Sequence, residues 1–182
     1  MSVRALCVYC GSNLGVREVY AEAAERLGHT LARHGIGLVY GGASKGLMGR
    51  LADTVLAAGG EVQGVIPRAL MHKEIAHTGV TRLHVVDTMH ERKALMARLA
   101  DGFVALPGGF GTLEEIIEIV TWAQLRFHAK PCGLLNVAGY FDHLIAYLAH
   151  AEEEGLLKPE HRRLLLVANE PEELLELFER RR

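Results

Sequence analysis

Short apolar segments alternate with amphipathic segments along the whole chain of 182 residues. Runs such as Ala5–Tyr9, Ile36–Tyr40 and Val62–Ile66 are almost wholly apolar and are followed closely by glycine or proline. Buried parallel strands have this character. Between them, segments such as Glu18–His34 place apolar residues along one face of a helix. The alternation therefore predicts a parallel sheet that is covered by helices.

The same pattern continues to the end of the chain. Further strands are expected at Leu83–Val86, Phe103–Leu106, Cys132–Asn136 and Leu164–Val167, and further helices at Leu47–Ala58, Met89–Ala100, Thr112–Phe127, Phe141–Glu153 and Pro171–Arg181. The segment Arg68–Thr78 has no clear period, and we expect a short helix and a loop there. The sequence thus predicts one doubly wound, Rossmann-like α/β domain over residues 1–182, with helices on both faces of a mostly parallel sheet.

Composition excludes several classes of protein. The net charge of −2 lacks the basic excess of a nucleic-acid-binding protein. No apolar run approaches the roughly 20 residues that span a bilayer, and the first residues do not have the pattern of a signal peptide. Three cysteines, an odd number, favour a reducing compartment. We therefore expect a cytoplasmic protein that binds neither membrane nor nucleic acid.

Three of the strand-to-helix turns are rich in glycine. They contain Gly11-Ser12, Gly41-Gly42 with Gly46, and the segment Pro107–Thr112. In doubly wound folds, ligands bind outside the carboxyl ends of the strands, where these turns lie. Glycine lets backbone N–H groups approach an anion closely, and the start of a helix favours negative charge. A single such turn can be a simple chain reversal, but three at one end of a sheet favour an anionic ligand.

The glycine-rich turns match neither of two common phosphate-binding loops. The dinucleotide pattern G-x-G-x-x-G is absent from the first turn, and no acidic residue ends the second strand at Tyr40. The Walker loop needs Gly-Lys-Ser/Thr, whereas Lys45 precedes Gly46 and Leu47 follows it. A nicotinamide cofactor and NTPase activity are both disfavoured.

The third turn leads into a helix whose first residues allow two interpretations. Thr112–Glu115 has the spacing of a capping box, in which Thr112 is the N-cap and Glu115 bonds back to its N–H group. Alternatively, Glu115 is a catalytic carboxylate beside the bound anion. Spacing alone leaves both open.

The preceding helix has two cations on an apolar stripe. Arg92 and Lys93 share this stripe with Met89 and Met96. A single cation could extend its charged end into water at the edge of the stripe. Two cations near the start of a helix favour a bound anion, because the helix dipole is unfavourable for cations there.

Three segments together resemble the LOG ("lonely guy") family, the cytokinin riboside 5′-monophosphate phosphoribohydrolases, long described as possible lysine decarboxylases. They are Gly41–Gly49, Met89–Lys93 and Pro107–Glu115, and the last has the pattern P-G-G-x-G-T-x-x-E. The similarity runs from Cys10 to Tyr140. The family often has a further glycine where this chain has Ala43.

The resemblance implies hydrolysis of the N-glycosidic bond of a purine nucleoside 5′-monophosphate, AMP or N6-modified AMP. The ten histidines are scattered, with no H-E-x-x-H pattern and no carboxylate cluster, so we expect no metal, and we expect no cofactor. The resemblance also implies that Arg92 and Glu115 are the catalytic pair. The substrate-binding positions that it implies are Glu74, Lys93, Gly109, Phe110, Gly111, Thr112, Leu113, Glu114 and Thr121. N-glycoside cleavage passes through an oxocarbenium-like state that a carboxylate stabilises, so the chemistry suits Glu115.

Thr121 raises a geometric question. It lies six residues after Glu115, about 240° around the helix and 9 Å along it, so one chain would hardly present both side chains to one nucleotide. The helix is also apolar over most of its circumference. Both features, and the family, favour a homodimer; the alternative is a helix buried in one large core.

The residues also allow functions other than hydrolysis. The main alternative, from a different functional class, is a protein that binds or senses AMP-like nucleotides without cleaving them. A lysine decarboxylase would need pyridoxal phosphate on a lysine, and nothing marks Lys45 or Lys93 for that role. Cys7 and Cys10 have redox-motif spacing, but Cys7 lies inside a predicted strand. The sequence does not indicate which base is preferred, nor whether the pathway is purine salvage or cytokinin production.

Overall fold

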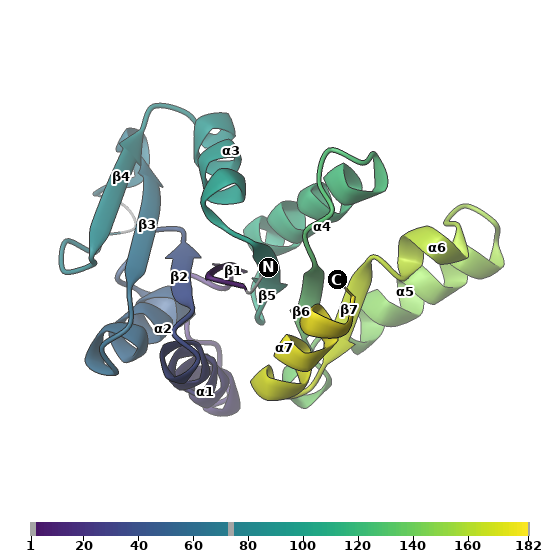
Figure 1. The fold of residues 1–182 in the computed structure, drawn as a ribbon, viewed down its shortest axis with the longest axis horizontal. Helices are drawn as coiled ribbons and strands as arrows, with labels where there is room; N and C mark the ends of the chain where they lie inside the picture. The colour runs from purple at the N-terminus through teal and green to yellow at the C-terminus, as the bar shows by residue number, and fades with distance from the viewer. Residues whose placement is uncertain (1–2, 73–74, 182) are drawn as a thin grey trace.

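The computed structural model describes residues 3–72 and 75–181. Within them, seven strands form one parallel sheet in the order β4-β3-β2-β1-β5-β6-β7 (Figure 1). The strands are β1 (Ala5–Tyr9), β2 (Gly37–Tyr40), β3 (Val62–Pro67), β4 (Arg82–Val86), β5 (Gly102–Ala105), β6 (Cys132–Leu135) and β7 (Leu165–Ala168). The predicted doubly wound α/β fold is confirmed.

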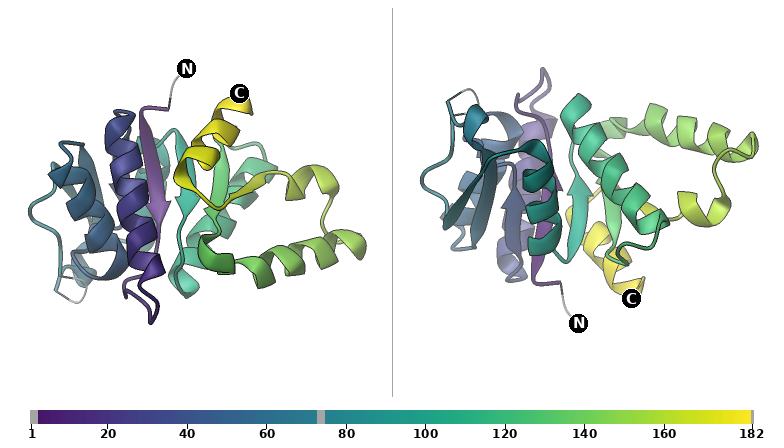
Figure 2. Two further views of the ribbon diagram at one scale, coloured as in Figure 1. Left: turned by 90° about the horizontal axis from the view of Figure 1, so that it is seen from below. Right: turned by 90° about the horizontal axis from the view of Figure 1, so that it is seen from above.

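Helices cover both faces of the sheet, as Figure 2 shows from opposite sides. The helices are α1 (Val19–Arg33), α2 (Gly46–Ala57), α3 (Met89–Leu99), α4 (Phe110–Gln124), α5 (Asp142–Glu153), α6 (Pro159–Arg162) and α7 (Pro171–Arg180), with 3-10 turns η1 (Arg68–Leu70) and η2 (Val137–Gly139). One core lies under α1, α2 and α7, and the other lies under α3, α4 and the start of α5. Helices α5 and α6 extend beyond the β7 edge of the sheet (Figure 1).

Strand β1 shows why both faces need helices. Leu6 and Val8 join the core under α1, whereas Cys7 and Tyr9 join the core under α3 and α4. Successive side chains of a strand point to opposite faces, so a strand that is apolar throughout needs cover on both. None of the described helices is long and apolar enough to span a bilayer.

The predicted bounds of α4 were wrong at both ends. The helix begins at Phe110, two residues before the predicted Thr112. It ends before Phe127 because Arg126 adopts a left-handed conformation with φ of 64°. The N–H of Phe127 then bonds to the carbonyl of Trp122, which closes the helix in a Schellman arrangement. The short helix α6 was not predicted, because four residues are too few to show a helical period.

Candidate active site

The order of the strands reverses between β1 and β5, and the glycine-rich turns meet at this point. The N–H of Gly11, after β1, donates to the carbonyl of Pro107, after β5, at 3.0 Å. The N–H of Leu47, after the turn that follows β2, donates to the carbonyl of Gly11 at 3.1 Å. Crevices at such reversal points are where doubly wound proteins bind ligands. The prediction that the three turns share one end of the sheet is confirmed.

A cleft of about 470 Å³ opens there. It is lined by many of the residues that the sequence indicates, namely Gly11, Ser12, Gly41, Arg92, Gly109, Phe110, Gly111, Thr112, Glu114 and Glu115. Its wall also includes residues that the sequence pattern did not indicate, among them Tyr20, Met48, Leu70, Met89 and Tyr140. The cleft has the volume of a small-molecule site, which typically ranges from about 300 to 1,000 Å³.

Arg92 is buried at the inner side of this cleft, with 6% of its surface exposed. Its Nε donates to the carbonyl of Val65 at 3.1 Å, and its Nη2 donates to the carbonyl of Gly41 at 3.1 Å. A Cβ at Gly41 would lie 2.1 Å from Nη2, so the guanidinium needs glycine there. The alternative in which this cation extends into water is wrong for Arg92. A buried guanidinium has to be compensated by acceptors or an anion.

Glu115 lies in the second turn of α4 and is half-buried in the wall of the cleft. Burial is the main reason that the pKa of the Cys7 thiol is raised, and Glu115 raises it further, whereas Arg92 lowers it. The two side chains therefore act on one buried atom of β1. The structure places the predicted catalytic pair in the same cleft, from two different helices.

The capping-box interpretation of Glu115 is wrong. The N-cap of α4 is Gly109, which makes Thr112 the third helical residue and places Glu115 too far along the helix to reach the N-cap N–H. In the described chain, no side chain caps this end of the helix. A capping box does occur at the start of α3, where Thr88 and Glu91 exchange both bonds.

The first turn of α4 has the form of an anion site. The N–H groups of a first turn have no partner within the helix, and they point outward along its axis. A Cβ built at Gly109 or Gly111 would meet nothing within 4 Å, and Gly111 has no left-handed backbone that would require glycine. The packing of the protein therefore does not explain glycine at Gly111, whereas close approach of a ligand would.

Several predicted residues lie elsewhere. Gly42 and Gly46 adopt left-handed conformations, and a Cβ at Gly46 would collide with the backbone of Ser12 at 2.2 Å, so both have structural reasons to be glycine. Leu113 is partly buried against the core under α4. None of these three is among the described residues that line the cleft. Their contact with substrate stays a prediction.

Lys93 points toward α4 instead of into the cleft. Its Nζ bonds to Glu114 at 2.5 Å and to Glu118 at 3.0 Å. Burial lowers the pKa of Lys93, but the hydrogen bonds to these two carboxylates outweigh it, so the net shift is upward. Lys93 thus joins α3 to α4 beside the cleft, and a direct contact with substrate stays a prediction.

The two remaining predicted positions are Glu74 and Thr121. Glu74 lies outside the described residues. The neighbouring Ile75 is fixed to the second glycine turn, because its carbonyl accepts bonds from both the N–H and the hydroxyl of Ser44, at 2.9 and 2.7 Å. Thr121 is exposed, and its hydroxyl donates to the carbonyl of Ile117 on the same helix. It is not among the residues that line the cleft of its own chain.

Comparison with known proteins gives a family and a fold. The profile of a family described as possible lysine decarboxylase matches residues 48–178. A probable cytokinin riboside 5′-monophosphate phosphoribohydrolase of Oryza sativa subsp. japonica is 52% identical over 96% of this chain and 78% of its own length. A cytokinin riboside 5′-monophosphate phosphoribohydrolase of Arabidopsis thaliana is 48% identical over 96% of this chain and 76% of its own.

Solved structures with similar folds are more distant in sequence. The molybdenum cofactor binding protein of Rippkaea orientalis has a TM-score of 0.72 at 23% identity, covering 99% of this chain and 98% of its own. The Moco carrier protein of Chlamydomonas reinhardtii has a TM-score of 0.73 at 21% identity, covering 97% and 96%. These likenesses support the α/β fold alone. With the matching profile and relatives near half identity, the chain belongs to the LOG family, also described as possible lysine decarboxylase.

Proposed function

We propose that this protein hydrolyses the N-glycosidic bond of a purine nucleoside 5′-monophosphate, AMP or an N6-modified AMP. Water adds to the anomeric carbon, and the products are the free base and ribose 5-phosphate. The observation that carries the proposal is the meeting of Arg92, Glu115 and the first turn of α4 in one cleft at the reversal point of the sheet. The names of the relatives at about half identity support it.

In this proposal the phosphate binds to the start of α4. The N–H groups of Gly109, Gly111 and Thr112 would receive it, and the glycines leave room for close approach. Because the phosphate takes no part in bond cleavage, its binding energy positions the ribose for reaction at the other end. This predicts that AMP is cleaved far better than adenosine.

Glu115 would act on the reacting carbon. Departure of the base leaves positive charge on the ribose ring, and an ionised carboxylate beside the ring stabilises that charge. The same carboxylate can orient the attacking water. Held by the carbonyls of Val65 and Gly41, Arg92 can keep Glu115 ionised and clamp the substrate.

A pyridoxal phosphate enzyme is a poorer match to the residues. A lysine that forms a Schiff base has to lose its proton, so it needs a lowered pKa. The two carboxylates that bond to Lys93 raise its pKa and hold the ammonium form.

The assembly and location of the protein are also proposals. An exposed apolar strip on α4 and just beyond its C-terminal end, made by Ile117, Leu125 and Phe127, suits a homodimer in which Thr121 serves the partner's cleft. The substrate is a small molecule, and the protein acts in the cytoplasm on neither membrane nor nucleic acid.

The decisive experiment is incubation of the purified protein with AMP, followed by chromatography for adenine and ribose 5-phosphate. Both products should appear in equal amounts, and the Glu115→Gln variant should form neither at a comparable rate. Binding of AMP by calorimetry without any release of adenine would contradict hydrolysis. It would favour the alternative of a nucleotide-sensing protein.

A further inference from the structure

Tyr140 connects the chain after β6 to the loop after β5. Its hydroxyl donates a hydrogen bond of 2.8 Å to the carbonyl of Gly108, and both residues line the cleft. The two residues are far apart in sequence, so this bond joins neighbouring strands of the sheet at their carboxyl ends. None of the roles assigned above uses Tyr140.

The backbone around Tyr140 is held in one shape. The preceding turn η2 contains Ala138 in a left-handed conformation with φ of 50°. The buried side chain of Asn136 accepts a bond from the N–H of Phe141 at 2.7 Å and donates to Asp142 at 2.8 Å. These bonds bracket Tyr140 on both sides, which is how a strained turn is kept in place.

The ring of Tyr140 is held as well. It meets the ring of Tyr20 edge-on at 5.4 Å and the ring of Phe141 edge-on at 5.1 Å. Such pairs favour one orientation of the ring. The hydroxyl is therefore carried by a ring with little freedom, although the residue as a whole is 40% exposed.

The bond to Gly108 controls a peptide group of the anion site. In a trans peptide, the carbonyl of Gly108 and the N–H of Gly109 point in opposite directions. Gly108 is also packed closely, since a Cβ there would lie 2.1 Å from the hydroxyl of Thr112 and 2.9 Å from the N–H of Gly11. The bond to Tyr140 and the close packing of Gly108 oppose rotation of this peptide, so the direction of the Gly109 N–H is favoured before any ligand arrives.

We infer that Tyr140 is a positioning residue for the recognition of a phosphate monoester in this cleft. Its hydroxyl holds the peptide between Gly108 and Gly109 so that the N–H is already aimed at the phosphate. The inference rests on the proposed function for the place of the phosphate. A donor that is fixed in advance costs less to order on binding, so loss of the hydroxyl weakens phosphate binding and leaves the chemical step unchanged.

The test is Tyr140→Phe, which keeps the ring and removes the hydroxyl. Calorimetry measures ribose 5-phosphate binding, and kinetics give KM and kcat for AMP with adenosine as a competitive inhibitor. We expect ribose 5-phosphate binding and KM for AMP to weaken by about 3- to 10-fold, the usual effect of one hydrogen bond. We expect kcat to stay within about twofold and the inhibition constant of adenosine to stay unchanged.

Tyr147→Phe is the matched control, because Tyr147 lies exposed on α5 and is not among the described residues that line the cleft. It should leave every constant unchanged. Wild-type affinity for ribose 5-phosphate in Tyr140→Phe, an equal loss for AMP and adenosine, or no ribose 5-phosphate binding by the wild type would each overturn the inference. If the wild type binds ribose 5-phosphate but does not cleave AMP, the proposed hydrolysis is wrong. The role of Tyr140 is then decided by calorimetry alone, from the affinity of Tyr140→Phe for ribose 5-phosphate compared with that of the wild type.

Discussion

At the scale of single residues, the charge of Glu115 can be separated from its shape. Glu115→Gln keeps the size of the side chain and removes the charge that would face a developing cation. Loss of one preorganised electrostatic contact typically lowers kcat by about 10²–10³. We expect Glu115→Gln to lose at least about 100-fold in kcat for AMP, while calorimetry shows that AMP still binds and the Tm is nearly unchanged.

The control for this variant lies one turn along the same helix. Glu118 bonds to Lys93 but is not among the described residues that line the cleft, so Glu118→Gln should keep wild-type kcat. Arg92→Ala should match the loss in Glu115→Gln, and the double variant should be little worse than either, because the two groups act together. Retention of more than about a tenth of wild-type kcat by Glu115→Gln would remove its catalytic role.

At the same scale, a substitution at Gly111 can separate an effect on protein stability from an effect on substrate binding. Gly111 is the second residue of α4, its backbone does not require glycine, and a Cβ there would meet no protein atom. Alanine is favoured over glycine in a helix, so Gly111→Ala should raise the free energy of unfolding by up to about 1 kcal/mol. If a phosphate sits against this turn, the same methyl group should raise KM for AMP. A more stable variant with unchanged KM would place the phosphate elsewhere.

At the scale of helices and strands, most elements could be predicted because each carries its own period. The bounds predicted for β1, Ala5–Tyr9, match the structure, since its apolar run is flanked by polar residues and glycine. The start of α4 was missed because Phe110 and Gly111 are weak helix formers, whereas Thr112 is a good N-cap. Here the helix begins against the local preference of its first residues. The contact of Tyr140 with Gly108 could not be predicted, because nothing in either segment specifies how they pack together.

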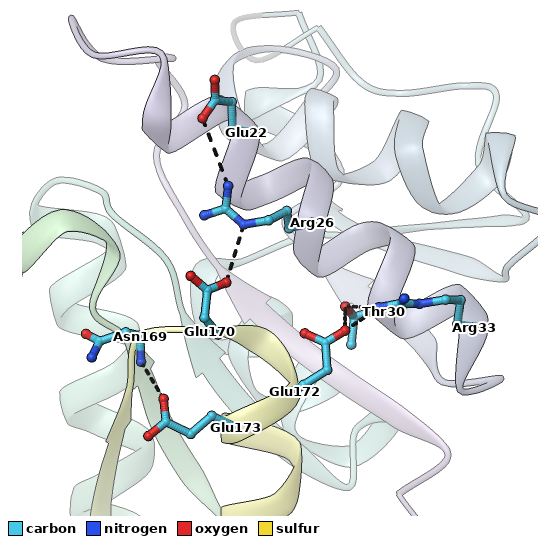
Figure 3. A network of polar contacts seen from close by, with 8 residues as sticks. All are labelled: Glu22, Arg26, Thr30, Arg33, Asn169, Glu170, Glu172 and Glu173. Carbon is cyan, nitrogen blue, oxygen red and sulfur yellow. Dashed lines mark hydrogen bonds and ion pairs between the residues drawn. The ribbon is translucent and has the colours of Figure 1, made fainter.

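Helix α7 contacts α1 through charged groups whose contribution to the stability of the fold depends on pH. Figure 3 shows the network, in which Glu172 of α7 accepts a bond from Thr30 at 2.8 Å and pairs with Arg33, while Glu170 pairs with Arg26 at 3.5 Å. Burial raises the pKa of Glu172, but the bonds from Thr30 and Arg33 lower it further than burial raises it. The carboxylate therefore stabilises the folded state above its ordinary pKa, and this contribution is lost as pH falls through the lowered value.

Glu172→Gln should test this contribution by urea unfolding at pH 7 and near pH 3. The side chain is 48% exposed, so solvent screens the ion pair and the loss at pH 7 should be below about 1 kcal/mol. As pH falls through the lowered pKa of Glu172, the difference from wild type should shrink, because the wild-type carboxyl takes up a proton. Glu179→Gln, exposed on the same helix, is the control and should show neither effect. A constant difference at both pH values would mean that charge is not involved.

At the scale of the whole molecule, the cleft residues of α4 and Thr121 lie apart, so one chain does not bring both to one cleft. The first two turns of α4 carry the cleft residues, whereas Thr121 is exposed beyond them with Ile117 and Leu125. Sequence spacing alone predicted this separation, since the geometry of a helix fixes where residues six apart must lie. A partner for the exposed strip could not be predicted in the same way, because the sequence of one chain does not describe a second molecule.

The dimer proposed for this strip predicts both mass and activity. Light scattering during size-exclusion chromatography should give a mass of about twice the chain mass of 20.0 kDa. Leu125→Glu places a charge on the apolar strip, where a buried unpaired charge is costly, so it should yield monomers. If Thr121 completes the partner's cleft, those monomers should also lose activity toward AMP. Ala57→Glu, on the exposed face of α2, should change neither mass nor activity. A fully active monomer, of either wild type or Leu125→Glu, would show that one chain suffices and that Thr121 has no part in catalysis.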